Sequence, residues 1–140
     1  MSAETTIRWG WLKFMYVYTI IGAGGCGLGL IFFPGVMKSA LGFSTQDPIT
    51  LGILASVYIA FGILSIPALR SPLKFVPILL LQLCYKAIWL IVIVLPLVVL
   101  GELPSYAIPL AVIFATYIIG DLIAIPFRYV FASEQDQQAV

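Results

Sequence analysis

Long apolar segments separated by short polar ones make up most of the chain. Four of these segments reach the ~20 apolar residues that a membrane-spanning helix requires, and we expect helices over 11–33, 48–69, 75–100 and 107–131. Asp47-Pro48 begins the second segment with a capping side chain followed by proline, as is typical of a helix start. The pattern therefore predicts an all-α, polytopic membrane protein, a four-transmembrane-helix antiparallel bundle in one domain over 1–131.

Two polar segments have a character of their own. The connector 34–47 mixes apolar and polar residues, and it is either a short helix lying in the membrane interface or an irregular loop dipping into the headgroups. Its apolar residues are Val36, Met37, Ala40, Leu41 and Phe43, and its polar residues include Lys38, Ser39, Ser44 and Thr45. Residues 132–140 form a polar C-terminal tail, which we expect to be disordered.

Composition supports the membrane assignment. Of the 140 residues, 62% are hydrophobic and 9% are charged, with a mean hydropathy of +1.13, whereas soluble domains average about 25% charged residues. The net charge of +1 provides no broad basic surface of the kind that nucleic-acid binding needs. We therefore expect a multi-pass integral membrane protein, in the cytoplasmic membrane if the source is bacterial, with the lipid bilayer and no nucleic acid as partner.

Lysine and arginine are distributed unevenly between the two ends of the predicted helices. If both termini lie on one side, the loops of the other side hold only Lys38. The side of the termini holds five basic residues: Arg8, Lys13, Arg70, Lys74 and Arg128. Because basic residues accumulate in cytoplasmic loops, we expect both termini to be cytoplasmic.

Signatures of catalysis and metal binding are missing from the sequence. The chain contains no histidine, the commonest general base and metal ligand. It also lacks a nucleophile with a base partner, paired carboxylates, and a carboxylate or cysteine cluster. We expect a protein that is not an enzyme and that holds neither a metal nor a cofactor.

The glycines of the first apolar segment predict close helix packing. Residues 22–27 match G-x-G-x-x-G letter for letter, but the dinucleotide fingerprint needs a preceding strand and these glycines lie inside an apolar run. Small residues at helical spacing let two backbones approach closely. We expect packing positions on the first two helices, facing each other or another subunit: Gly22, Gly25, Gly29, Gly52, Ser56 and Ala60.

Two charged residues fall inside predicted spans. At a rise of ~1.5 Å per residue, Lys86 lies near mid-membrane and Asp121 lies in the inner half, where charges are costly and usually face protein or water. If the third and fourth helices are antiparallel neighbours, Gln82 is level with Asp121. Tyr117 lies one turn from Asp121 on the same face of the fourth helix. We therefore expect a buried polar cluster, with a Lys86–Asp121 pair, made of Lys86, Asp121, Gln82 and Tyr117.

This cluster is compatible with two functions. A buried ion pair can simply fix helix packing, which fits a non-catalytic accessory or structural subunit of a homo-oligomer or larger membrane complex, and this is the leading hypothesis. Alternatively, the protein is a small transporter or binder of a proton-linked or lipophilic anionic ligand, with Lys86 as the charge and Asp121 as its partner. The partner would then be a lipid or a lipophilic small molecule.

The stretch G-L-G-L-I-F-F-P-G-V-M-K-S-A-L-G-F (27–43), followed by a Gly/Ala-rich second helix, resembles the DoxX-like group of small four-helix membrane proteins. The resemblance extends over residues 18 to 70. It implies an accessory membrane subunit of a redox or quinone-linked system, or a protein whose function is unknown. No site residue is carried over from it.

Overall fold

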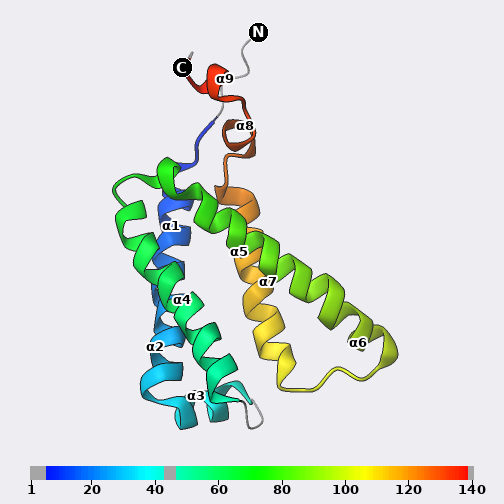
Figure 1. Ribbon diagram of the computed structural model, residues 1–140. Coiled ribbons are helices and arrows are strands. Elements are labelled where there is room, and N and C mark those ends of the chain that lie inside the picture. The colour runs from blue at the N-terminus through cyan, green and yellow to red at the C-terminus, as the bar shows by residue number, and fades with distance from the viewer. Residues whose placement is uncertain (1–5, 43–46, 139–140) are drawn as a thin grey trace.

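The computed structural model describes residues 6–42 and 47–138, and all regular secondary structure within them is helical (Figure 1). Four helical spans are long and apolar enough to cross a membrane, namely Trp9–Phe32, Pro48–Ala68, Pro72–Leu100 and Ala107–Ala124. The predictions of an all-helical fold and of four spanning helices are confirmed. Length and composition together identify an integral, multi-pass membrane protein.

The first span changes its helical geometry at its centre. It consists of α1 (Trp9–Thr19), the π-helical segment η1 (Ile20–Gly24) and α2 (Gly25–Phe32). A π turn contains one residue more than an α turn. The buried residues are Leu12, Met15, Tyr16 and Thr19 before the turn, Ala23 and Gly24 within it, and Gly27 and Leu30 after it, so one buried face continues along the span.

The connector after the first span forms the helix α3 (Pro34–Leu41), which ends at Gly42 with a φ of 71°. This favours the interfacial helix over the irregular loop, although Phe43, Ser44 and Thr45 lie outside the described residues. The second span, α4 (Pro48–Ala68), begins at the cap Asp47, whose carboxylate accepts a hydrogen bond from the Thr50 amide at 2.9 Å. Hydrogen bonds from Thr50 lower the pKa of this exposed carboxyl.

The third and fourth spans differ from the predicted limits. The third span runs through η2 (Pro72–Phe75), α5 (Val76–Ile88), the π-helical η3 (Trp89–Val94) and α6 (Leu95–Leu100). The fourth, α7 (Ala107–Ala124), ends well before residue 131, because Ile125 is extended, as a residue before proline tends to be. The chain then forms α8 (Phe127–Val130). Residues 134–138 of the predicted disordered tail form α9 (Glu134–Gln138).

The four spans do not pack equally. The first span lies between α4 and α7, and α5 packs against α7 (Figure 1). The main core cluster joins the first span with the start of α5 and the end of α7, through Leu12, Met15, Tyr16, Val76, Leu79 and Ala124. By contrast, η3 and α6 lean away from α4 and α7, and Val94 is the one buried residue of Trp89–Leu100.

Candidate ligand-binding site

Lys86 lies inside the protein and is surrounded by aromatic rings. Its side chain is 1% exposed, and Nζ lies 3.9 Å from the centroid of the Tyr117 ring. The centroids of Tyr85 and Phe114 are 4.8 and 5.4 Å from the same atom. A cation over an aromatic face is attracted by the ring quadrupole, and more strongly where water is excluded. The ammonium group is therefore held by rings from α5 and α7.

Asp121 is equally buried, at 0% exposed. Lys86 Nζ and both carboxylate oxygens of Asp121 have no hydrogen-bond partner among the described residues. The two groups interact through space by their charges, but the expected pair makes no hydrogen bond. Buried polar atoms are nearly always hydrogen-bonded. Three buried polar atoms among the described residues are therefore unsatisfied in one apolar region of the protein.

The other two residues of the predicted cluster are buried but bond to the first span. Gln82 Nε2 donates to the Thr19 hydroxyl at 3.2 Å, so this amide is not directed to Asp121. The Tyr117 hydroxyl donates to the carbonyl oxygen of Tyr18 at 2.9 Å, and the two tyrosine rings stack at 4.1 Å. The reason is that the first span lies against both side chains and supplies the acceptors, Thr19 for Gln82 and Tyr18 for Tyr117.

The first two spans approach each other closely at Gly24, Gly27 and Gly62, and none of these was among the predicted packing positions. A Cβ on Gly62 of α4 would lie 2.8 Å from the Cα of Gly24. A Cβ on Gly27 would lie 2.7 Å from the carbonyl oxygen of Ala55. Both contacts are with backbone atoms that a side-chain movement cannot clear, so these glycines fix the spacing of the two helices.

Two of the six predicted packing positions make room for side chains. A Cβ on Gly22 would collide with the Tyr117 hydroxyl, and one on Gly29 would lie 2.7 Å from the Met37 sulfur in α3. The other four face outward: Gly25 and Gly52 have no atom within 4 Å of an added Cβ, and Ser56 and Ala60 are exposed. These four do not lie in the contact between the first two spans, so the alternative of packing against another subunit stays a prediction.

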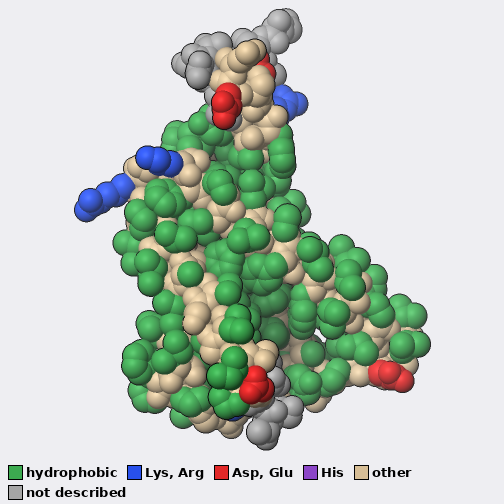
Figure 2. Space-filling view, viewed as in Figure 1, with side chains coloured by type: hydrophobic (Ala, Val, Ile, Leu, Met, Phe, Trp, Pro, Cys, Tyr) green, Lys and Arg blue, Asp and Glu red, His purple; other side chains and the backbone are tan. Residues whose placement is uncertain are grey.

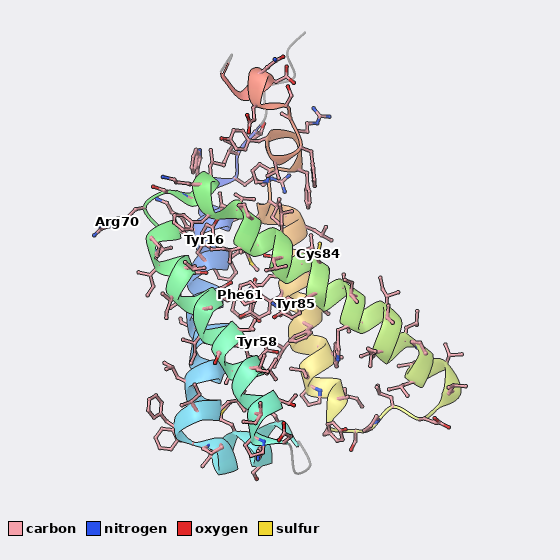
Figure 3. All side chains as sticks on the ribbon, viewed as in Figure 1. Tyr16, Tyr58, Phe61, Arg70, Cys84 and Tyr85 are labelled. Atoms are coloured by element: carbon pink, nitrogen blue, oxygen red, sulfur yellow. The ribbon has the colours of Figure 1, made fainter. Side chains whose placement is uncertain are left out.

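An apolar cleft of about 400 Å³ opens beside the buried charges, between α4, the third span and α7. Its walls include Leu54, Tyr58, Trp89, Leu97 and Leu110, and its floor is formed by Tyr85 and Phe114. The floor rings belong to an aromatic cluster in which Trp89 lies 5.1 Å and Tyr85 6.0 Å from Phe114, between centroids. Figure 3 shows Tyr58 and Tyr85 projecting into the space between α4 and α5.

The cleft and the buried charge share two side chains. Tyr85 and Phe114 line the cleft and also lie against Lys86 Nζ, so these rings separate the apolar space from the ammonium group. No three His, Cys, Asp or Glu side chains are grouped to hold a metal ion in 6–42 or 47–138. The cleft can provide apolar contacts for the body of a ligand, and Lys86 can provide a charge for its head group.

Several residues of the site were missed at the level of sequence. Thr19 is fully buried and holds Gln82, and the Tyr16 hydroxyl donates to the carbonyl oxygen of Pro72 at 2.6 Å. Both are polar groups in an apolar run at helical spacing from Leu12, a signal that was available. Phe114, three residues before Tyr117, carried no such signal because its role depends on the neighbouring helix.

Comparison of the chain with protein-family models, curated proteins and solved structures gives no match. The resemblance to the DoxX-like group therefore stays a prediction, and the function has to be argued from the site.

Proposed function

We propose that this protein is a non-catalytic membrane protein that binds, and carries in a proton-linked way, a lipophilic molecule with an acidic head. One observation is the basis: Lys86 and Asp121 are buried without hydrogen-bond partners, and two rings that line an apolar cleft, Tyr85 and Phe114, also lie against the Lys86 ammonium group. An ion pair kept for packing offsets its desolvation cost through direct hydrogen bonds, and this pair makes none. The ligand-binding hypothesis is therefore better supported than the structural one.

The cleft accounts for the apolar part of the ligand. The ligand body would lie against Leu54, Leu97 and Leu110, and rotation of Tyr85 or Phe114 would admit its head to Lys86. An entering anion pairs with the ammonium group and leaves Asp121 without a balancing charge. Uptake of one proton by that carboxylate restores neutrality in the low-dielectric interior, which links ligand binding to proton binding.

The proposed arrangement in the membrane is a four-helix antiparallel bundle with both termini in the cytoplasm. The excess of basic residues supports this orientation, because five of the six basic residues other than Lys86 belong to the side of the termini. Figure 2 shows basic side chains near the end of the molecule where α8 and α9 lie in Figure 1. The cleft is lined by Leu103 and Pro104 of the opposite end, and it would thus open in the outer half of the bilayer.

A second candidate, an accessory subunit, is favoured by a different observation. The second half of the third span, Trp89–Leu100, contacts little of the remaining protein and exposes a long apolar surface that includes Ile91, Val98 and Val99. Gly25, Ser56 and Ala60 also face outward, where another helix could approach closely. Co-purification of one protein in fixed stoichiometry would support this candidate.

Photolabelling tests the proposed function. The protein, reconstituted in phosphatidylcholine vesicles, is irradiated with a fatty acid that carries a diazirine in its tail, and labelled peptides are mapped by mass spectrometry. We expect labels on the cleft walls, at α4, Trp89–Leu100 and the start of α7, with competition by unlabelled fatty acid and stronger labelling at mildly acidic pH.

The decisive variant is Lys86→Met with Asp121→Asn, since replacing both partners of a buried pair is often tolerated. It should stay folded and lose the competed label. Lys74→Met, at an exposed lysine of the same span, is the matched control and should keep it. Equal competed labelling in the double variant, or labels spread over the outer faces of all four spans, would contradict ligand binding at this site.

A further inference from the structure

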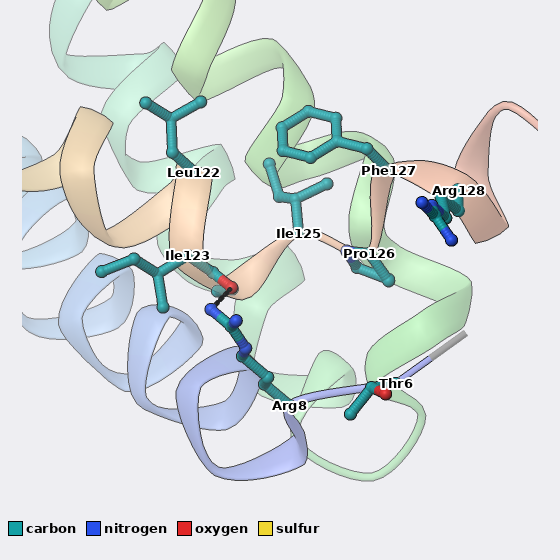
Figure 4. A pocket seen from close by; sticks show the side chains of 9 residues that line it. Thr6, Arg8, Leu122, Ile123, Ile125, Pro126, Phe127 and Arg128 are labelled. Atoms are coloured by element: carbon teal, nitrogen blue, oxygen red, sulfur yellow. Dashed lines mark hydrogen bonds between the residues drawn. The ribbon is translucent and has the colours of Figure 1, made fainter. Parts of the chain in front are cut away.

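A second cavity, separate from the cleft, lies at the end of α7. The helix ends at Ala124, Ile125 is extended with φ −70° and ψ 122°, and Pro126 turns the chain into α8. A cavity of about 360 Å³ lies beside this break (Figure 4). Its lining combines two arginines, Arg8 and Arg128, with Thr6 and with apolar side chains such as Leu122 and Phe127.

The charged side chains among the described residues that line this cavity are both arginines. Arg8 Nη1 donates to the carbonyl oxygen of Ile123 at 3.4 Å, a favourable position for a cation at a helix C-terminus. A guanidinium group has five N–H donors, so most of those of Arg8 remain free for a second acceptor. Of the nine described residues that line the cavity, none is acidic. The acids of the neighbouring α9, Glu134 and Asp136, lie outside the lining.

The position of the cavity indicates what kind of anion would fit. It lies where an apolar span ends, with exposed Leu122 on α7 on one side and the two arginines beyond the last helical turn. Trp9 and Trp11 lie in the next turn after Arg8 and are about half exposed, as tryptophans at a membrane–water interface are. A ligand at this level would place an apolar part beside Leu122 and Phe127 and an anionic part between the arginines.

We propose that this cavity binds the phosphate of an anionic phospholipid headgroup. Arg8 and Arg128 contact the phosphate oxygens, for which the planar guanidinium is well suited, and the Thr6 hydroxyl offers a further donor. Leu122 and Phe127 contact the first part of the acyl chains. The proposal does not depend on the cleft or on the ligand of Lys86. Inorganic phosphate shares the same chemistry, and the experiment distinguishes the two sources.

Lipid retention in native mass spectrometry tests the proposal. The full-length protein is released from nanodiscs that contain equal amounts of dioleoylphosphatidylglycerol and dioleoylphosphatidylcholine. We expect preferential retention of one phosphatidylglycerol. Two basic residues at about 1 kcal/mol each imply that Arg8→Gln with Arg128→Gln weakens retention about 30-fold. Arg70→Gln, at an exposed arginine outside the cavity lining, is the matched control and should retain the lipid like the wild type.

Tryptophan quenching provides a second readout. Brominated phosphatidylglycerol in phosphatidylcholine vesicles should quench Trp9 and Trp11 in the wild type beyond its mole fraction, and only in proportion to it in the double variant. Equal retention in the double variant and the Arg70→Gln control would overturn the proposal, as would equal retention of both lipids by the wild type. Displacement of the lipid by millimolar inorganic phosphate would overturn the lipid assignment. If circular dichroism shows the double variant unfolded, Arg128→Gln alone should give about 5-fold weaker retention.

Discussion

The two halves of the third span are parts of one continuous helical segment, yet they have opposite environments. The first half, α5, contains Gln82 and Lys86 and buries both against the first span and α7, whereas Trp89–Leu100 is apolar throughout and buries only Val94. The more polar half is therefore the packed one. Lipid chains are as apolar as leucine, so apolar side chains gain little by leaving them. In this protein, polar residues mark the interior better than apolar ones do.

The largest expected effect tests whether Lys86 of the packed half and Asp121 of α7 depend on each other. Lys86→Met alone leaves Asp121 as an uncompensated buried charge, and we expect a loss of about 3–5 kcal/mol in the free energy of unfolding. Lys86→Met with Asp121→Asn should recover most of that loss. Unfolding by sodium dodecyl sulfate in mixed micelles, followed by circular dichroism, measures both. Additive losses would show that the two charges do not interact.

The next effect compares the halves by equivalent truncations. Leu79 in α5 is 0% exposed and Val98 in α6 is 53% exposed. Leu79→Ala should cost about 2–4 kcal/mol through lost packing, and Val98→Ala should stay within about 0.5 kcal/mol. The same unfolding assay measures both. A substantial loss from Val98→Ala in the purified protein would mean that the second half packs against something in solution, as the accessory-subunit candidate requires.

A smaller effect concerns the first two spans, which stay in contact where the third one departs. Gly27→Ala places a Cβ against the backbone of Ala55 and should destabilise the protein by about 1–3 kcal/mol. Gly25→Ala meets no atom within 4 Å, and its higher helix propensity should stabilise the protein by up to about 1 kcal/mol. Similar losses from both variants would contradict the assignment of Gly27, and not Gly25, to the contact between the first two spans.

The smallest effect is a pH dependence at the start of α4. Because hydrogen bonds from Thr50 lower the pKa of the Asp47 carboxyl, the carboxylate stabilises the folded state above the ordinary pKa range of aspartate. That contribution is lost as the pH falls through the lowered pKa. Hydrogen exchange at the first turn of α4, corrected for the intrinsic pH dependence, should rise in acid. Asp47→Ala should exchange fast at every pH, and an acid-induced rise that persists in it would exclude this cap as the cause.

The spans could be predicted from sequence because their length and apolarity are local properties. The end of α7 could not be placed from hydropathy, since Leu122–Phe131 remains largely apolar past the break; Pro126 was the available signal. The burial of Lys86 and Asp121 followed from the cost of charge in a membrane. Their surroundings did not follow, because they depend on which helix lies opposite. Gln82 was expected to face Asp121 and instead meets Thr19, a contact decided by the position of α1.

The π turn at Ile20–Gly24 determines where the first span can lose one residue and still fold. Loss of one residue from an α-helix rotates everything beyond it by about 100° relative to its neighbours. Within Ile20–Gly24, loss of one residue would instead convert the π turn to an α turn and leave Gly27 and Leu30 facing α4. A single-codon deletion there should yield a folded protein. The same deletion two turns earlier or later in the span should not.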